Sequence, residues 1–115
     1  MPNNLMKREQ EPNELRRGHR IFTKALLDRF KTLGDQDVDD PIVVMKLFCG
    51  QWTWYCTSYN ESDRIFFGFV IGLEREWGSF SFDELAELNQ GLTIVERDKW
   101  FSECKFSDLK FGDLL

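Results

Sequence analysis

The stretch from residue 42 to residue 82 constrains the fold most, because it reads as consecutive strands rich in β-branched and aromatic residues. Ile42–Phe48 and Trp52–Tyr59 are separated by a tight turn at Gly50, and Ile65–Gly72 follows after a polar turn. Ile65–Gly72 is apolar on both faces, which is typical of a central strand covered on both sides. Leu73–Phe82 continues the series. These residues predict an antiparallel meander.

The turn at Gly50 fixes which side chains share a face, provided that it pairs Cys49 with Trp52. One face then carries Val43, Met45, Leu47, Trp52, Trp54 and Cys56, and the other carries Val44, Lys46, Phe48, Thr53, Tyr55 and Thr57. The first set is wholly apolar and predicts the core. The second is only partly polar and predicts a face that is half covered.

Two glycines in the third strand predict local irregularity. Gly68 and Gly72 lie in an otherwise bulky run, where glycine would loosen an ordinary strand. We expect them to serve a bend, a bulge or the close approach of a neighbouring ring.

Capping signals place two short helices. Thr23 has the properties of an N-cap, with Phe22 and Leu27 spaced as a hydrophobic staple and Gly34 as a stop. Ser81 and Glu84 stand in capping-box spacing, which predicts a helix near residues 82–90 that ends at Gly91.

The remaining C-terminal part predicts a short strand at residues 92–95, followed by two aromatic anchors, Trp100 and Phe101. A short helical turn packed by Leu109 and Phe111 completes the chain. The expected fold class is therefore α+β, an antiparallel meander of about five strands with a short N-terminal helix and the helix near residues 82–90.

Length and composition indicate one domain. The chain has 115 residues, 42% hydrophobic and 15% aromatic, which is enough to bury a core. Residues 1–20 are polar and contain Pro2 and Pro12, so we interpret them as a mobile or marginally helical N-terminal extension and residues 21–115 as the single domain. The net charge of -5 is uneven. Residues 1–34 are basic and the rest is acidic. Such an asymmetry is typical of a protein that binds a charged partner, or of a solvated basic segment beside an acidic body.

Several classes of protein are disfavoured. Cys49, Cys56 and Cys104 form no CxxC pair and the chain has one histidine, so neither zinc nor a disulfide framework is expected, and no cofactor. No signal-peptide core and no apolar stretch of roughly 20 residues is visible. We therefore expect a cytoplasmic protein without a membrane contact.

The chain resembles the bacterial domain-of-unknown-function family 2958, which is found on plasmids, prophages and integrative elements. The residues that carry the resemblance span about 21–111: Thr23-Lys24 with Leu27, Asp40-Pro41-Ile42-Val43-Val44 with Lys46 and Phe48, Trp52-Thr53-Trp54-Tyr55 with Thr57, Phe66-Phe67-Gly68 with Val70 and Gly72, Glu74 with Glu76, Gly78, Phe80-Ser81 with Glu84-Leu85, and Glu96-Arg97-Asp98 with Phe101. The resemblance implies a mobile-element setting and no particular activity. Ser58 and Asn60 stand where the family pattern has acids, and Trp77 replaces an aliphatic residue.

Two acid pairs are the first candidate for chemistry. Glu74 and Glu76 would share one strand face, and Glu96 and Asp98 are spaced likewise around Arg97. Such pairs can bind a divalent metal or carry acid–base catalysis. The alternative is that Arg97, with or without Arg75, bridges these acids and so fixes the edge of the meander against residues 96–98. No Ser-His-Asp set, Cys-His pair or glycine-rich phosphate loop is present.

The aromatic residues and the basic segment are two further candidates. Rings on a sheet can stack nucleic-acid bases, but such surfaces need a basic lining and this sheet is acidic, so we interpret most rings as core, with Tyr55 and Trp77 exposed. The plausible phosphate-facing surface is the basic segment that contains Arg16, Arg17, Arg20 and Lys24.

Three functions remain open at this point. The first is a non-enzymatic interaction module of a phage or mobile element, which binds or inhibits a host or element-encoded complex, such as a nucleic-acid-processing or anti-defence target, through an acidic surface. The residues expected to bind the partner are Tyr55, Glu74, Glu76, Trp77, Glu96, Arg97 and Asp98. The second is nucleic-acid binding through the basic segment, and the third is a metal-dependent hydrolase. The oligomeric state stays open.

Overall fold

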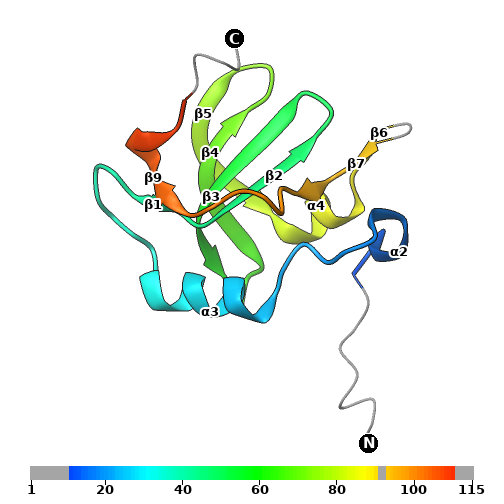
Figure 1. Ribbon diagram of the computed structural model, residues 1–115, viewed down its shortest axis with the longest axis horizontal. Coiled ribbons are helices and arrows are strands. Elements are labelled where there is room, and N and C mark those ends of the chain that lie inside the picture. Colours follow the sequence, from blue (N-terminus) through cyan, green and yellow to red (C-terminus); the bar gives the residue numbers. More distant parts are fainter. Residues whose placement is uncertain (1–10, 91–92, 111–115) are drawn as a thin grey trace, which may run out of the picture.

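The computed structural model describes residues 11–90 and 93–110. Five strands form an antiparallel sheet in the order β5-β4-β3-β2-β8 (Figure 1). They are β2 (Met45–Cys49), β3 (Trp52–Asn60), β4 (Ile65–Ile71), β5 (Arg75–Ser81) and β8 (Glu96–Arg97). Two small ladders pair β1 (Ile42–Val43) with β9 (Cys104–Lys105) and β6 (Asn89–Gln90) with β7 (Thr93–Ile94). The helices are α2 (Glu14–Arg17), α3 (Lys24–Leu33), α4 (Phe82–Glu87) and the 3-10 turn η1 (Phe106–Asp108). The predicted α+β class is confirmed.

The four consecutive strands β2 to β5 form the predicted meander, and the turn pairs Cys49 with Trp52 as expected. The short strand predicted at residues 92–95 is present as β7, which pairs with β6. The fifth strand of the main sheet is β8 instead, in which Glu96 and Arg97 pair with Phe48 and Leu47 at the edge of β2.

A bulge at Val44 changes the expected faces of the first strand. The backbone N–H of Val44 donates to the carbonyl of Cys56 at 2.9 Å, while Met45 also lies opposite Cys56. Two residues therefore oppose one, which shifts the alternation by one position. Val44 joins Met45 in the main core, and Val43 is buried beside Cys104 of β9. The prediction that Val43 shares the core face was wrong.

The two predicted helix starts are confirmed. The Thr23 hydroxyl accepts from the Leu26 amide at 3.2 Å, and the Ser81 hydroxyl accepts from the Glu84 amide at 3.2 Å. Helix α3 ends at Gly34 as predicted. Helix α4 is shorter than predicted and ends at Glu87, because the next residues enter β6.

One face of the sheet packs a mainly aromatic core against α3, α4 and the chain around Phe22. The Phe22 and Phe66 rings stack at 5.5 Å between centroids, and Tyr59 lies 4.6 Å from both. Phe30 from α3 and Phe82 from α4 contact the same rings. The interpretation of most rings as core is confirmed on this face.

The other face is covered by the C-terminal segment. Phe101 lies 6.3 Å from Tyr55, and Phe106 lies 5.0 Å from Phe69 and 4.7 Å from Trp77. Phe101 is thus an anchor, as predicted. Trp100 is not, since it is 92% exposed. The predicted contact of Phe111 lies outside the described residues.

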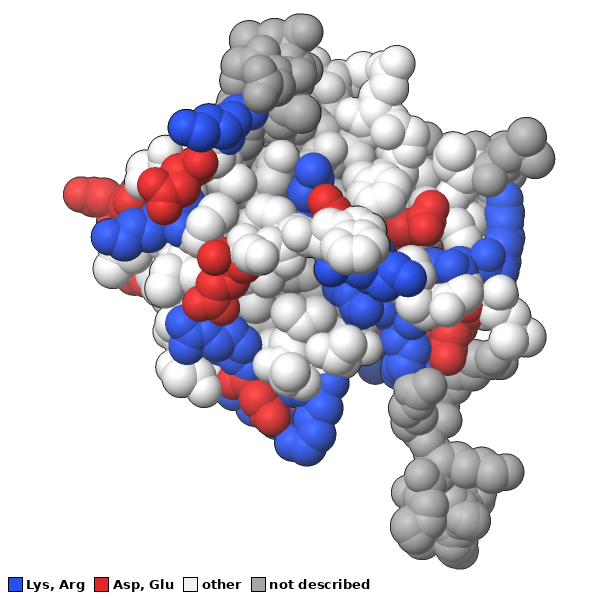
Figure 2. Space-filling model, in the orientation of Figure 1, with Lys and Arg blue, Asp and Glu red and all other residues white. Residues whose placement is uncertain are grey.

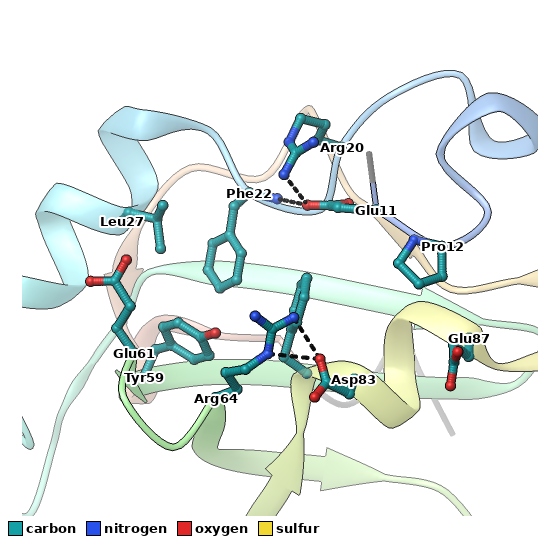
Figure 3. Close-up of a pocket in the computed structure, with 11 residues that line it drawn as sticks. Glu11, Pro12, Arg20, Phe22, Leu27, Tyr59, Glu61, Arg64, Asp83 and Glu87 are labelled. Atoms are coloured by element: carbon teal, nitrogen blue, oxygen red, sulfur yellow. Dashed lines mark hydrogen bonds and ion pairs between the residues drawn. The ribbon is translucent and has the colours of Figure 1, made fainter. Parts of the chain in front are cut away.

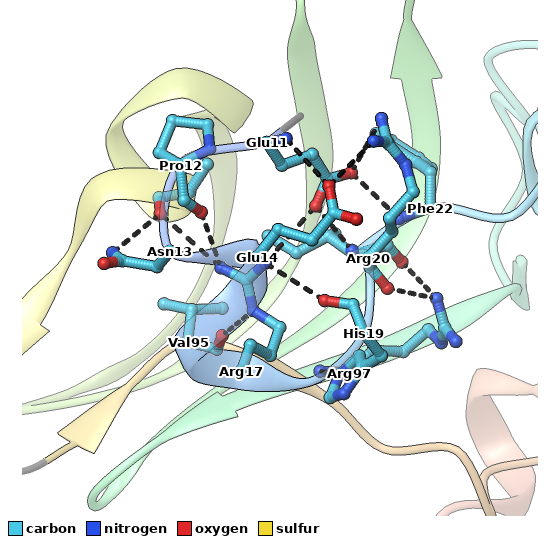
Figure 4. A network of polar contacts seen from close by, with 12 residues as sticks. Glu11, Pro12, Asn13, Glu14, Arg17, His19, Arg20, Phe22, Val95 and Arg97 are labelled. Carbon is cyan, nitrogen blue, oxygen red and sulfur yellow. Dashed lines mark hydrogen bonds and ion pairs between the residues drawn. The ribbon is translucent and has the colours of Figure 1, made fainter. Parts of the chain in front are cut away.

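Residues 11–20 pack against the body through a buried ion pair (Figure 4). Arg17 lies 3.3 Å from Glu11, and both residues are buried. The Arg17 guanidinium also donates to the carbonyl of Val95 at 2.7 Å and to that of Ala86 at 3.5 Å. Glu11 in turn accepts from the Ile21 amide at 2.7 Å. This part of the predicted extension is therefore integrated with the sheet and α4.

Candidate functional site

The two predicted acid pairs lie on opposite edges of the sheet. Glu76 is on β5 and Glu74 immediately precedes it, whereas Glu96 lies on β8 and Asp98 follows it. Four strand spacings of about 4.8 Å separate these edges, or about 19 Å. The acids therefore do not converge on one site, and the expectation that Arg97 bridges the two pairs was wrong.

The Arg97 side chain binds backbone carbonyls instead of carboxylates. Its Nη1 donates to the carbonyls of Arg20 at 2.6 Å and Ile21 at 2.7 Å, and its own amide donates to His19 Nε2 at 3.3 Å (Figure 4). Burial lowers the pKa of Arg97 from its usual value, partly opposed by Glu11. Arg97 thus fastens the chain before α3 to the edge strand β8.

Asp98 and Tyr55 are also engaged within the molecule. Asp98 lies 3.6 Å from Lys46 Nζ and accepts from the Trp100 amide at 2.9 Å. Lys46 Nζ in turn lies 5.8 Å from the Tyr55 ring centroid. Tyr55 is only 4% exposed, so the prediction that it reaches solvent was wrong. Its burial, together with Asp98, raises its pKa.

Trp77 is exposed as predicted. Its ring is 39% exposed and stacks on Phe67, itself 41% exposed, at 5.9 Å and an interplanar angle of 14°. Glu76 precedes Trp77 on the same strand, so their side chains point to opposite faces of the sheet. The exposed ring pair consequently belongs to a different surface from that acid.

The acidic loop before β1 lies opposite this ring pair. We call the space between them the acidic–aromatic groove, formed by Asp35, Asp37, Asp39, Phe67 and Trp77. Its volume is about 700 Å³. Within the described residues none of the three aspartates has an ion pair or a side-chain hydrogen bond. The sequence predicted the loop and the exposed Trp77, but not their proximity.

Two polar anchors hold the loop in this place. Gln36 Nε2 donates to the carbonyls of Ile42 at 2.9 Å and Thr57 at 2.7 Å, and its Oε1 accepts from the Ile42 amide. At the other end Asp40 accepts from the Ser107 hydroxyl at 2.7 Å, and these bonds from Ser107 lower the pKa of Asp40. Gln36, a glutamine between two aspartates, was the one sequence signal that this loop is attached to the sheet.

Ser58 lies in the wall of the groove. It follows the β-bulge between Cys56 and Ser58 and is 7% exposed. Its neighbour Thr57 donates its hydroxyl to the carbonyl of Phe67 at 3.2 Å, whereas the Ser58 hydroxyl has no hydrogen-bond partner in the part of the chain that the structure describes. A buried hydroxyl without a partner is unusual, and this one belongs to a residue that lines the groove.

A second cavity of about 690 Å³ lies between the turn after β3, α4 and the N-terminal segment (Figure 3). Arg64 pairs with Asp83 at 2.6 Å on one wall, and Arg20 pairs with Glu11 at 3.5 Å on another. Burial raises the pKa of Tyr59 to about 12. Because these charges neutralise one another, the cavity walls do not favour a ligand of either charge.

The basic segment does not form a continuous phosphate-facing surface. Arg17 is buried, Arg20 pairs with Glu11 and Glu14, and Lys24 pairs with Asp28 at 3.0 Å. Arg16 is exposed. Figure 2 shows basic and acidic side chains interspersed over the visible face of the molecule. The geometry therefore adds nothing to the nucleic-acid hypothesis.

The described residues contain no group of three or more His, Cys, Asp or Glu side chains placed to hold a metal ion. The single histidine accepts a hydrogen bond from Arg97. All three cysteines are free thiols, and burial raises the pKa of Cys56. No helix of the described part is long and apolar enough to cross a membrane.

The chain matches the model of a protein family. The model described as "Protein of unknown function (DUF2958)" matches residues 20–108, which agrees with the resemblance carried by the strand motifs. No curated protein and no solved structure matches the chain significantly.

Proposed function

The chain belongs to the DUF2958 family, and on that basis we propose that it is a non-enzymatic protein-interaction module that binds its partner through the acidic–aromatic groove. One observation carries the proposal: the exposed Phe67 and Trp77 rings stack beside three aspartates that have no partner within the described residues. The acidic surface expected from the sequence thereby moves from Glu74 and Glu96 to the loop of residues 35–39.

The exposed rings support a protein partner. Aromatic residues, tryptophan above all, are enriched at the centres of protein interfaces, where water is excluded around them. Carboxylates at the border of such a centre attract a basic partner and exclude acidic ones. A groove with both features is suited to a basic protein surface that carries apolar contacts.

The proposed setting is a phage, plasmid or other mobile element, and the proposed partner is a host or element-encoded complex in the cytoplasm. The family resemblance supports this setting, and the free thiols suit a reducing compartment. Complexes that process nucleic acids, including defence complexes, expose basic phosphate-binding grooves. An acidic module can occupy such a groove and inhibit the complex.

Affinity purification from the native host tests the proposal. The wild-type chain is compared with Asp35→Asn/Asp37→Asn/Asp39→Asn combined with Trp77→Leu, and with a control that neutralises Glu74, Glu76, Glu96 and Asp98. We expect a co-purifying protein that the groove variant loses and the control retains. Equal recovery with the groove variant would refute the groove as the binding surface, provided that circular dichroism shows the variant to be folded.

A further inference from the structure

We propose that the acidic–aromatic groove binds an arginine side chain of the partner. This inference rests on the proposed function and specifies its chemistry. The guanidinium would lie against the Phe67–Trp77 pair, donate to the aspartates of the 35–39 loop and donate to the Ser58 hydroxyl.

The ring pair provides the first contact. Arginine stacks on aromatic faces more readily than lysine because its guanidinium is planar and weakly hydrated. Trp77 contacts Phe69 of β4 and Phe106 of η1, with ring centroids 5.3 Å and 4.7 Å away, so its orientation is fixed before a ligand arrives. A preorganised ring costs a ligand little ordering entropy.

The loop provides the charge. Asp35, Asp37 and Asp39 are exposed and line the groove. Gln36 ties the loop to Thr57 and Asp40 ties it to η1, which keeps the carboxylates in front of the rings. Carboxylate oxygens match the paired N–H groups of a guanidinium, and charge-assisted bonds of this kind are about twice as strong as neutral ones.

Ser58 provides an independent observation. Its hydroxyl is buried in the groove wall and makes no hydrogen bond within the described residues. Leaving a buried polar group unsatisfied is unfavourable, and Ser58 is one of the residues that line the groove, so a donor bound there can satisfy its hydroxyl. A guanidinium has five N–H donors and can satisfy the hydroxyl and the carboxylates together.

Titration with acetyl-arginine methylamide, followed by NMR of the full chain, tests the inference. We expect saturable shifts at the Trp77 indole N–H and at the amides of residues 35–39 and Ser58. The lysine counterpart should bind several-fold more weakly. The citrulline counterpart, which has a similar shape without the charge, should give no saturable shift.

Two variants separate binding from folding. Trp77→Leu should lower the affinity for the arginine probe about tenfold or more, because the stacking ring is lost. Ser58→Ala should lower the affinity for the probe about three- to tenfold, the usual effect of one lost hydrogen bond, without lowering the melting temperature. Unchanged affinity in both variants would overturn the inference.

The probe and the purification fail in different ways. No saturable shift, or equal shifts at acids outside the groove such as Glu84 and Glu87, would overturn the arginine site even if the groove variant still loses its partner. Conversely, arginine binding without any groove-dependent partner would support the site and refute the proposed function.

Discussion

Arg17 Nε donates a 2.7 Å hydrogen bond to the carbonyl of Val95, which joins the N-terminal segment to the strand region after α4. The same guanidinium pairs with the buried Glu11. Because a buried charge without its partner is strongly unfavourable, we predict that Arg17→Met lowers the free energy of unfolding by about 3–5 kcal/mol. Lys24→Met, which removes an exposed cation from an i,i+4 pair with Asp28, should change it by about 0.5 kcal/mol or less. Urea unfolding of both variants measures the difference, and equal stability would contradict a structural role for Arg17.

Three glycines, Gly68 in β4, Gly72 directly after β4 and Gly78 in β5, predict a graded alanine series. At Gly68 a Cβ atom would collide with the backbone carbonyl of Tyr55, and at Gly72 it would collide with the Trp52 ring. At Gly78 no heavy atom lies within 4 Å. Backbone yields less than a side chain, so we expect Gly68→Ala to be the most destabilising, Gly72→Ala to cost about 1–3 kcal/mol, and Gly78→Ala to be neutral or stabilising. Melting temperatures rank the three, and a destabilised Gly78→Ala would contradict the assignment.

The single histidine predicts a pH dependence. His19 Nε2 accepts from the Arg97 amide, which requires the neutral ring, and burial together with Arg97 lowers the His19 pKa from 6.5. The unfolded chain therefore binds this proton more readily than the folded chain. The contribution of His19 to stability is complete above pH 6.5 and is lost as the pH falls from there to the folded pKa.

Urea unfolding across that range, with His19→Gln as the control, checks the prediction. The histidine-free variant should lack this component of the pH dependence, while carboxylate titration at lower pH stays common to both. Identical pH profiles would show that His19 is not the responsible group.

Both tyrosines of the chain should titrate late. Burial raises the pKa of Tyr55, and it raises that of Tyr59 to about 12, against an ordinary value of 10.0. Ultraviolet absorbance of phenolate should therefore show no midpoint near pH 10 while the protein is folded. The contribution of the two tyrosines to stability should be complete below pH 10 and fall above it, since the unfolded chain releases these protons first. Phenolate formation at pH 10 in folded protein would contradict the burial of both rings.

Local signals predicted much of the fold. The caps at Thr23 and Ser81 and the pairing of Cys49 with Trp52 each depend on residues within one or two turns of chain, so the sequence contains the whole interaction. The bulge at Val44 depends on Cys56 in the next strand, and the pairing of β8 depends on Leu47 and Phe48, far earlier in the chain. The pattern of a single sequence does not show which separated residues pair.

The candidate site divides in the same way. Trp77 follows a glycine-containing strand and precedes Gly78, and its exposure could be predicted from the polar residues around it. That Asp35–Asp39 stand opposite Trp77 could not, because Gln36 makes the connection through Thr57, 21 residues away. Tyr55 was misplaced because the covering ring, Phe101, comes from the far end of the chain.

The network of Glu11 and Arg17 has a practical consequence for dissecting this family. The region shared with the family model begins at residue 20, so a chain cut there would discard both residues. The amide of Ile21 and the carbonyl of Val95 would then be left without their side-chain partners, and α4 would lose its contact with the segment before α3. A fragment that keeps the Glu11–Arg17 ion pair and its hydrogen bonds to Ile21 and Val95 must therefore begin at or before Glu11. In any exchange of parts with a relative, the segment before residue 20 must accompany the strands that it holds.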